Sequence, residues 1–534
     1  MFMGIETEYA VSGRDRDGGR VSQATLCEGL MAAARQRLVY LPDGTPHGMF
    51  VSNGSRFYLD YGMHPEWSTC ECSEPAELVR YVRAGDEILR VLADDARDRL
   101  SLAEVGVYRG NVDYSGSGAT WASHESLLYR SDPRAMGPQI VPHLASRILF
   151  CGSGGFGNLS EAQLQFTLSP RAFHIVRTSS GDSTHDRGLW HRKNEPLGIG
   201  YNRLHLLTGE SLCSDLATYL RIGTTALIVA LVDLGDAPGE AVQLRSPVVA
   251  LRTFAGDPHG VRQARLFDGR RVSALDIQRH YLAAAERRIG HAEMPAFAEA
   301  VCRRWREVLD LVEQGPHAVA DRLDWAVKWQ LYGRQIERAG LDWEKVGAWN
   351  RFLNRVFGAG TNPVTLEREP DLGTEARLRR VRRWIAAHAG TDARSTPPGS
   401  LDELAELFAL RQRLFELDTR FAQLGSEGIF NALDCAGLLA HRLAEAGRVA
   451  EAVDYPPERG RARARGEAIL RCAGNADRYL AEWHGIYDHQ DDSWLDLKDP
   501  YRSDGVWQGP PTERRRSVED FLRRSLRRLL PSET

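Results

Sequence analysis

Two glutamates two residues apart lie in the first predicted strand of the chain, at residues 3–9. Because side chains of a strand alternate between its faces, Glu6 and Glu8 project on the same side. Two neighbouring carboxylates are costly unless a cation lies between them. Oxygen ligands with no histidine or cysteine in the same segment favour Mg²⁺ or Mn²⁺, commonly with a nucleotide phosphate attached. The alternative is an edge strand with two solvated glutamates.

A second group of polar side chains lies at residues 53–72. The Asn-Gly pair at 53–54 predicts a turn, and residues 55–61 then alternate like a strand. Gly62 and Pro65 would end that strand and start a loop beside it. Because a sheet normally turns an apolar face to its core, charges on one face of two neighbouring strands indicate a site. The polar residues are Arg56, Tyr58 and Asp60 on one face of the strand, and His64, Glu66 and Glu71 in the loop.

A third group spans residues 108–126. Asn111 and Asp113 are one strand repeat apart, and a Gly/Ser-rich loop at 114–120 separates them from the pair His124-Glu125. Such a His-Glu pair is also common as a satisfied surface pair, so its meaning depends on the other two groups.

In this order, the three groups resemble the Pup ligase and depupylase family. Its members carry G-[IT]-E-x-E-[YF], then N-G-[AS]-R-x-Y-x-D-x-x-x-H-P-E, then N-x-D followed by a His-Glu stretch; here these are residues 4–9, 53–66 and 111–125. Matches in one order over nearly the whole chain are more specific than any single motif. The further matching segments are 201–205, 221–227, 273–279, 324–328, 456–467 and 498–501.

The resemblance implies an α+β, glutamine-synthetase-like fold: a curved antiparallel sheet forms a cradle packed against helices, and a small C-terminal domain follows. The cradle would bind ATP and Mg²⁺. Ligases of the family phosphorylate the γ-carboxylate of the C-terminal glutamate of Pup, a small disordered protein, and a substrate lysine then attacks to form an isopeptide bond. Depupylases cut that bond or deamidate a C-terminal glutamine.

Roles for individual residues are likewise implied by the resemblance. Asp60 matches the catalytic aspartate, which in a ligase takes a proton from the attacking lysine; a structural carboxylate of the metal cluster is the alternative. Metal-site candidates are Glu6, Glu8, Tyr58, Glu66 and Glu71. Candidates for nucleotide contacts are Arg56, Asn111, His124, Lys193, Arg203 and His205, and those for substrate contacts are Arg461, Arg463 and Arg465.

Residues 191–200 depart from the family pattern. Lys193 stands where the family has an arginine, and the usual His and Asp after Glu195-Pro196 are missing. Lysine is a point charge where arginine offers a planar fork, so the grip on phosphate would have an altered geometry. This departure leaves open whether the standard substrate is used.

The spacing of the motifs favours a ligase. Depupylases carry a long loop between the first strand and the N-G-[AS]-R strand, whereas only 43 residues (10–52) separate them here. The alternatives are a depupylase or deamidase, a ligase acting on a small molecule or peptide, and a regulatory nucleotide-binding protein without activity. The clustered carboxylates argue against the last of these.

The composition agrees with a globular cytoplasmic enzyme without nucleic acid or membrane as a partner, and the resemblance implies that it acts on a Pup-like protein or a glutamate-bearing peptide and on a protein lysine. The chain has 534 residues, a formal charge of −4 and 43% hydrophobic residues. It has no basic-apolar leader pattern, and its most apolar stretch, 224–234, is far below the ~20 residues of a membrane span and predicts a buried helix. The eight cysteines are sparse, so reduced thiols are expected. We interpret Cys70 and Cys72 as packing residues.

Strand patterns dominate before residue 211, apart from predicted helices at 23–37 and 77–100. Helical periodicity follows, with long amphipathic stretches at 273–313, 320–340 and 401–424. The glycine-rich run at 152–157 lacks a G-K-[ST] ending and predicts a turn. The expected domains are a catalytic domain at 1–440, with a helical insertion at 366–410, and a small C-terminal domain at 441–534 ending in an amphipathic helix.

Overall fold

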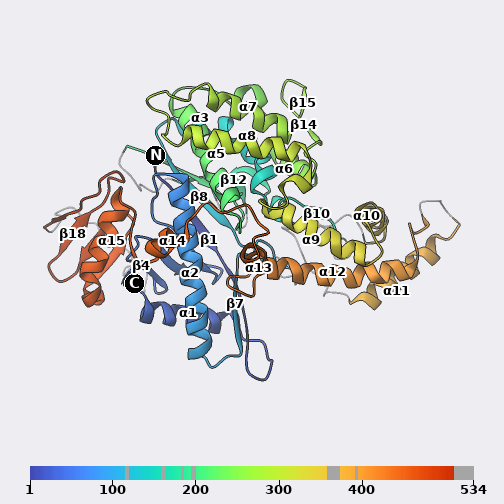
Figure 1. Ribbon diagram of the computed structural model, residues 1–534, viewed down its shortest axis with the longest axis horizontal. Coiled ribbons are helices and arrows are strands. Elements are labelled where there is room, and N and C mark those ends of the chain that lie inside the picture. Colours follow the sequence, from blue (N-terminus) through green and yellow to red (C-terminus); the bar gives the residue numbers. More distant parts are fainter. Residues whose placement is uncertain are drawn as a thin grey trace, which may run out of the picture.

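A nine-stranded sheet forms the centre of the protein (Figure 1). The computed structural model describes residues 1–114, 119–157, 164–181, 186–193, 200–357, 373–390 and 395–509, with only the backbone of 192 and 193. All neighbouring strands are antiparallel except β11 and β12, which are parallel. In spatial order the strands are β11 (Arg177–Ser180), β12 (Gly188–Lys193), β13 (Asn202–Leu206), β8 (Ser123–Tyr129), β1 (Met3–Glu8), β6 (Pro65–Ser68), β5 (Arg56–Leu59), β4 (Gly48–Val51) and β3 (Tyr40–Pro42).

The two faces of this sheet differ in polarity. In β1 burial alternates residue by residue, with Ile5 and Thr7 buried and Glu6 and Glu8 partly exposed. The apolar face packs against α2 (Pro75–Arg99) and α5 (Asp215–Asp233). The α+β architecture with helices behind a cradle therefore agrees with the expectation from the sequence.

The first two helices match the sequence prediction. Helix α1 spans Gln23–Arg37, as predicted, and its N-cap is Ser22, whose side chain accepts from the backbone N–H of Thr25. Helix α2 begins two residues earlier than predicted, because Pro75 stands at the first helical position, where its missing N–H costs nothing.

A third N-terminal helix was missed. Helix α3 (Pro133–Ser146) and the short α4 (Ile148–Cys151) lie where the sequence predicted strands. Pro138 and Pro142 lie inside α3 and each removes a backbone donor, so the segment does not resemble a helix by propensity. Burial of Ile140, Leu144 and their neighbours in the main core stabilises it nonetheless.

Helix α5 is the most apolar element. By length and composition alone it could cross a membrane, but its apolar window is entirely buried inside the protein. The predicted buried helix at 224–234 is thereby confirmed as part of a longer core helix.

The remaining helices of the large helical layer follow α5 in the chain. The stretch 273–313, predicted as continuous, is divided between α7 and α8, with Gly290 at a positive φ of 88° between them. The helices of this layer that follow α5 are α6 (Pro247–Ala255), α7 (Ala274–Glu286), α8 (Ala298–Glu313), α9 (Asp324–Arg338) and α10 (Trp343–Phe357).

A helical arm projects from this layer, to the right in Figure 1. It consists of α11 (Thr374–His388) and α12 (Leu401–Phe421), which pack against each other. The predicted insertion at 366–410 thus includes α11 and the first half of α12, and its residues 366–372 and 391–394 lie outside the described residues.

The C-terminal part begins with α13 (Ile429–Cys435) and α14 (Ala446–Asp454), and α14 packs on α2. Helix α15 (Arg461–Cys472) then joins a four-stranded antiparallel sheet, on the left of Figure 1. The predicted terminal helix after residue 514 lies outside the described residues. The strands are β16 (Tyr479–Glu482), β17 (Gly485–Asp488), β18 (Ser493–Asp496) and β19 (Val506–Gln508).

Three two-stranded sheets complete the fold: β2 (Ala10–Arg14) with β7 (Glu104–Tyr108), β9 (Gly155–Phe156) with β10 (Phe166–Thr167), and β14 (Gln263–Arg265) with β15 (Arg271–Ser273). The predicted glycine-rich turn precedes and enters β9, and Gly154 there has a φ of 67°. Residues 109–113 continue beyond β7 outside any strand, so the strand-like spacing of Asn111 and Asp113 does not correspond to a strand. All eight cysteines are free, and Cys70 and Cys72 are fully buried.

Candidate active site

Strand register collects the polar side chains predicted from the sequence into two rows across the open face of the sheet. In the first row, Glu66 on β6 lies opposite both Glu8 on β1 and Tyr58 on β5. The second row runs across four strands and contains Arg56, Ser68, Glu6 and His124.

Glu66 therefore lies in a strand and not in the predicted loop. Pro65 was read as a strand breaker, but it is the first residue of β6, where a missing backbone donor is tolerated. As a result Glu66 directly faces the first strand, with 5% of its surface exposed.

Glu6 forms one corner of the site together with two histidines. Ligand atoms of Glu6, His124 and His205 all lie within 4.8 Å of one another. Arg203 Nη2 donates to Glu6 Oε1 at 2.7 Å and Arg203 Nε donates to Ser126 Oγ at 3.0 Å. Burial alone would raise the pKa of Glu6, but the hydrogen bond with His124 and the charges of His205 and Arg203 hold it well below its ordinary value.

Glu8, Asp60 and His64 form a second corner, again with ligand atoms within 4.8 Å of one another. Glu8 Oε2 accepts from the backbone N–H of Ala122 at 2.8 Å. His64 Nδ1 lies 4.0 Å from Glu8 Oε2 and 3.1 Å from Asp60 Oδ2. Burial would lower the pKa of His64, but the hydrogen bond to Asp60 and the charges of Asp60 and Glu8 raise it.

Asp60 is held by the tight turn that connects β5 to β6. Its Oδ1 accepts from the backbone N–H of His64 at 2.7 Å, and its carbonyl accepts from Met63 N at 3.0 Å. Met63 adopts a φ of 58°, in the left-handed region, which closes this turn. Tyr61, at the tip, is fully exposed, so Asp60 lies at the mouth of the site.

Between the two corners, Glu66 is forced toward its neutral form. Burial raises its pKa well above the ordinary value, and the negative charges of Glu6 and Glu8 raise it further. Bound cations would relieve this repulsion, so the residues present fit the divalent metal that the sequence predicted. The donor set differs from the prediction in one respect: register adds imidazoles to the carboxylates, so nitrogen as well as oxygen ligands are available.

Tyr58 and Arg56 flank the carboxylates. Arg56 Cζ lies 3.9 Å from the centroid of the Tyr58 ring, and Arg56 Nε donates to Asp43 Oδ2 at 2.7 Å. Burial and the charges of Glu66 and Glu6 raise the pKa of Tyr58 well above its ordinary value, so it is a neutral phenol in this structure.

Glu71 does not belong to the carboxylate cluster. Arg461 Nε donates to Glu71 Oε1 at 2.6 Å, and Arg465 binds Oε2. Although burial would raise the pKa of Glu71, the charges of Arg465 and Arg461 lower it to about 2. Both carboxylate oxygens are therefore engaged by arginines, which corrects the expectation that Glu71 faces a metal.

Arg461 and Arg465 face the sheet, whereas the third predicted arginine does not. Arg463 pairs with Glu467 one helical turn away, and 49% of its side chain is exposed. A helix places positions 461 and 465 on one face and turns 463 away from it, so the alternate spacing in sequence does not translate into one surface.

Asn111 is also placed differently from the prediction. Its Nδ2 donates to the Ser211 carbonyl at 3.1 Å and its Oδ1 accepts from Ser211 N at 2.8 Å. These two hydrogen bonds join the Asn111 loop to the Ser211 loop, and they use one of the two amide hydrogens and one of the two oxygen lone pairs, so the nucleotide contact of Asn111 stays a prediction. The backbone of Lys193 lies opposite Arg203 in the register of β12 and β13, but its side chain is outside the described residues.

A small cavity of about 70 Å³ adjoins the Glu6 corner and adds residues that the sequence did not predict. Thr69 and Trp483 line it together with Glu6, Arg203 and Arg461. Trp483 comes from the C-terminal four-stranded sheet, far from the other residues in sequence, so no local pattern could have identified it. A flat aromatic side chain beside arginines and carboxylates is suited to a nucleotide base.

Glu125, on the opposite face of β8 from His124, is part of a buried ionic cluster. Arg147 binds it through two contacts, Nη2 to Oε1 at 2.6 Å and Nη1 to Oε2 at 2.8 Å. Arg221 Nε lies 3.5 Å from Oε1. This cluster ties α3 and α5 to the strand that carries His124.

Comparison with known proteins places this chain among ligases. The sequence model of the family described as Pup-ligase protein matches residues 1–351 and 401–487. The chain is 29% identical over 513 residues to Pup--protein ligase 1 of Rhodococcus erythropolis, covering 94% of this chain and 96% of the relative. The same figures hold for the Pup--protein ligase of Mycobacterium avium strain 104.

Two solved structures share the fold. The crystal structure of the complex between prokaryotic ubiquitin-like protein Pup and its ligase PafA matches with a TM-score of 0.71 and 22% identity, over 100% of this chain and 96% of that one. The structure of PafA in complex with ADP matches with a TM-score of 0.65 and 23% identity, over 89% of this chain and 90% of that one.

Proposed function

Because the chain belongs to the Pup-ligase protein family, we propose that its sheet face is the active site of an ATP- and Mg²⁺-dependent Pup ligase. The enzyme joins the γ-carboxylate of the C-terminal glutamate of a Pup-like protein to a lysine amine, forming an isopeptide bond. The observation that carries this proposal is the row of Tyr58, Glu66 and Glu8 beside the Glu6–His124 corner, with Asp60 at the mouth.

The carboxylates and imidazoles of the two corners would hold the metal. We assign Glu6, His124 and His205 of the first corner and Glu8 of the second to the metal, together with Glu66, which lies between the corners and beside Tyr58. A divalent metal held by these residues would neutralise charge on the phosphates of ATP during phosphoryl transfer.

Arginines supply the remaining positive charge. Arg203 already donates to Glu6 and Ser126, which fixes its guanidinium at the edge of the carboxylate cluster, where it can contact a phosphate. Arg56 is oriented by Asp43 and by the Tyr58 ring. The cavity lined by Trp483 and Thr69 would receive the base of the nucleotide.

Asp60 would act as the general base. A lysine ammonium must lose a proton before its nitrogen can attack an activated carboxyl group, and a carboxylate at the mouth of the site can accept that proton. The backbone N–H and ring of His64 hold both oxygens of Asp60, so the carboxylate is oriented before the substrate arrives.

The segment between the first two site strands supports ligation over the reverse reaction. Residues 10–52 contain β2, α1, β3 and β4 joined by short connections, so this described segment lacks the long loop expected of depupylases.

The direct test uses the full chain with Mg²⁺, ATP and a Pup-type peptide ending in glutamate. For the wild type we expect peptide-dependent ADP release, and with an added lysine-bearing protein, an isopeptide conjugate. For Asp60→Asn we expect conjugation to fall by ~10²–10⁴-fold, because proton transfer is lost, with ATP affinity unchanged. The exposed Asp17→Asn is the matched control and should behave like the wild type.

Other outcomes would reject this proposal. Cleavage of a preformed conjugate without any conjugation would identify a depupylase. ATP binding without peptide-stimulated ADP release would indicate a different donor.

We also propose that the enzyme works in the cytoplasm, where Pup-like and target proteins meet; fractionation of the cells with an antibody against the chain tests this.

A further inference from the structure

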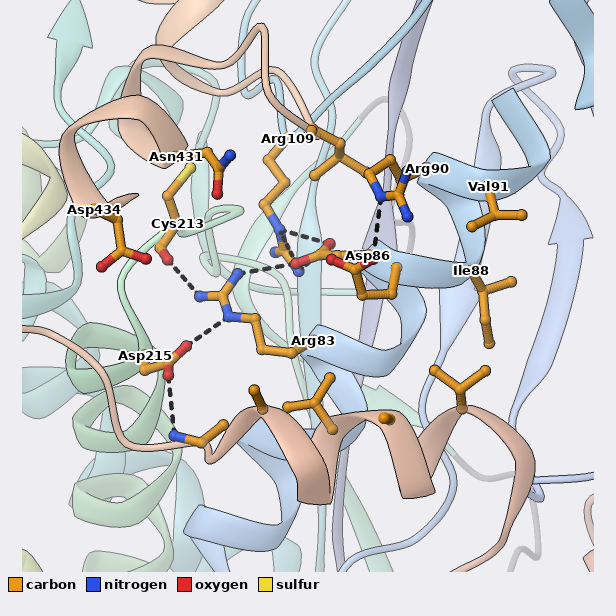
Figure 2. Close-up of a pocket in the computed structure, with 18 of the residues that line it drawn as sticks. Arg83, Asp86, Ile88, Arg90, Val91, Arg109, Cys213, Asp215, Asn431 and Asp434 are labelled. Atoms are coloured by element: carbon orange, nitrogen blue, oxygen red, sulfur yellow. Dashed lines mark hydrogen bonds and ion pairs between the residues drawn. The ribbon is translucent and has the colours of Figure 1, made fainter. Parts of the chain in front are cut away.

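A large cavity in the described part of the protein lies away from the active site. It has a volume of about 690 Å³ and opens between α2, the end of β4 and the segment that contains α13 and α14 (Figure 2). None of its lining residues lines the cavity beside Trp483. A hollow of this size falls in the range of small-molecule sites.

One wall of the cavity is an apolar helix stripe. Ala446, Val449, Ala450 and Val453 recur at helical spacing and line the cavity from α14, which forms its floor in Figure 2. Such a stripe normally packs on a core, yet Ala446 and Ala450 are exposed and the two valines are only half-buried. Ile88 and Val91 of α2, labelled in the figure, form part of the facing wall.

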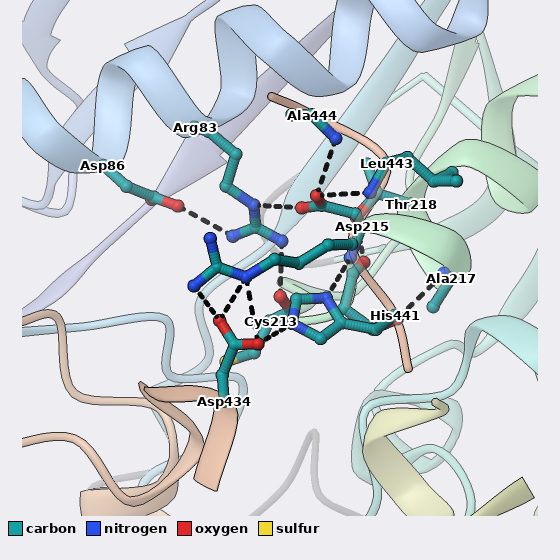
Figure 3. Close-up of polar contacts among 12 residues, drawn as sticks. Arg83, Asp86, Cys213, Asp215, Ala217, Thr218, Asp434, His441, Leu443 and Ala444 are labelled. Carbon is teal, nitrogen blue, oxygen red and sulfur yellow. Dashed lines mark hydrogen bonds and ion pairs between the residues drawn. The ribbon is translucent and has the colours of Figure 1, made fainter. Parts of the chain in front are cut away.

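The other end of the cavity is polar and rigid (Figure 3). Arg83 Nε donates to Asp215 at 2.5 Å and Nη1 donates to Asp86 at 2.9 Å. Asp215 also accepts from the backbone N–H groups of Leu443 at 3.0 Å and Ala444 at 3.1 Å. This network connects α2, α5 and the segment before α14, so the polar end is preformed.

Hydrogen-bond donors remain at this end. Arg109 is 2% exposed and its Nε donates to Asp86, but its Nη2, although 2.6 Å from Asp86 Oδ1, makes no hydrogen bond with the described residues. Asn431 contacts only the Cys435 thiol through its Oδ1, which leaves the amide nitrogen without an acceptor in the described chain. Arg90 pairs with Glu87 and Asp94 through Nε and Nη1, and its Nη2 is likewise unused there.

We propose that this cavity is a second ligand site, for a small amphipathic carboxylate. Arg90, Arg109 and Asn431 line the cavity and offer donors to an anionic acceptor group, and the valine and isoleucine walls match an alkyl or aromatic body. The acidic groups of the network are already paired with arginines, so they do not oppose the charge of a carboxylate ligand.

Binding of octanoate to the full chain, measured by calorimetry without ATP or peptide, tests this inference independently of ligase activity. We expect saturable binding of one octanoate, and much weaker binding of acetate, which has no tail, and of 1-octanol, which has no charge. Ala450→Phe places a ring in the cavity and should weaken binding by ~10-fold or more. Glu451→Phe, on the opposite side of α14, is the matched control and should bind octanoate like the wild type.

The polar end is tested separately. Arg90→Gln and Asn431→Leu each remove a donor from a partly exposed position and should weaken octanoate ~3–10-fold while leaving 1-octanol unchanged. The inference is overturned if octanoate shows no saturable binding, if 1-octanol binds as tightly, or if Ala450→Phe binds like the wild type. If Ala450→Phe does not fold, the Arg90→Gln result decides alone.

Discussion

At the scale of single residues, the site separates two glutamates that share one face. Glu6 has a lowered pKa because His124, His205 and Arg203 surround it, whereas Glu66 has a raised pKa because burial and its acidic neighbours disfavour its charge. In the metal-free site, the surroundings therefore stabilise the negative charge of Glu6 and destabilise that of Glu66. This asymmetry makes Glu66 the group most sensitive to a cation.

Glu66→Gln tests this asymmetry. The folded-state pKa of Glu66 is raised above its unfolded value, so the folded chain binds more protons than the unfolded chain in the window between them. The free energy of unfolding of the metal-free wild type should thus decrease as pH rises above about 4.5, and the variant should lose that decrease. Thermal melts in EDTA across that range measure it.

Metal provides the complementary comparison. Mg²⁺ should raise the melting temperature of the wild type near neutral pH, because it neutralises the carboxylates, and should raise that of Glu66→Gln less. An equal increase in both proteins would mean that Glu66 does not sense the metal.

At the scale of elements, α15 is attached to the cradle by apolar packing of Ala464, Ala468 and Ile469 near Leu41 and Phe50, and by a buried ionic contact. Arg461 and Arg465 both bind Glu71, just after β6, and Arg465 also donates to the Gly54 carbonyl at 2.9 Å. Arg465 of the same helix also donates to the backbone carbonyl of Trp483 at 2.9 Å. The position of the nucleotide-side cavity therefore depends on this contact.

Arg465→Met should remove most of this ionic contact. We expect a loss of about 3 kcal/mol in the free energy of unfolding and weaker ATP binding, since a buried carboxylate is left with one arginine. Arg463→Met on the same helix is exposed and should change stability by less than about 0.5 kcal/mol. Urea unfolding and ATP titration of both variants measure this, and equal effects would contradict it.

The contact between Glu71 and the two arginines also predicts a loss of stability at acid pH. The folded-state pKa of Glu71 is lowered to about 2, so its contribution to stability is present above the ordinary pKa of about 4.5. That contribution should decline as pH falls from 4.5 toward 2, and Glu71→Gln should lack the decline in urea unfolding measured over that range.

At the scale of the whole molecule, the helical arm is only partly shared with the family. The family model omits residues 352–400, which include α11, but matches α12. Near its C-terminal end α12 contributes Asp418, which binds Lys328 at 2.6 Å and accepts from Tyr114 at 2.8 Å. The base of the arm is therefore integral, whereas α11 packs on α12 and, through Trp384 and Phe352, on α10.

Replacing residues 358–399 by a Gly/Ser linker of about 12 residues should preserve activity. A Cβ at Gly399 would lie 3.3 Å from the Trp349 ring, and Phe357 is ~12 Å further along α10, so the linker can span the gap. We expect ADP release within about twofold of the wild type and a melting temperature lower by a few degrees, because Phe408 loses its contact with Arg377. A loss of activity above tenfold would place the arm in the substrate site.

The local patterns of this chain were sufficient for part of the fold and site. Alternation in a strand is a property of the backbone, so Glu6 and Glu8, and Arg56 and Tyr58, could be placed on shared faces before any partner was known. The same holds for α1, whose cap and periodicity are both local.

The partners of those residues were decided only by tertiary structure. The register of β1 and β8 brings His124 to Glu6 across 118 positions, and the docking of α15 brings two arginines to Glu71 from 390 and 394 residues away. Pro65 could begin a strand and α3 could form around two prolines because pairing and burial outweigh local preference. Sequence determined which groups this protein presents, because side-chain direction is local; only folding decided what each meets, because charge pairing and burial act between distant segments.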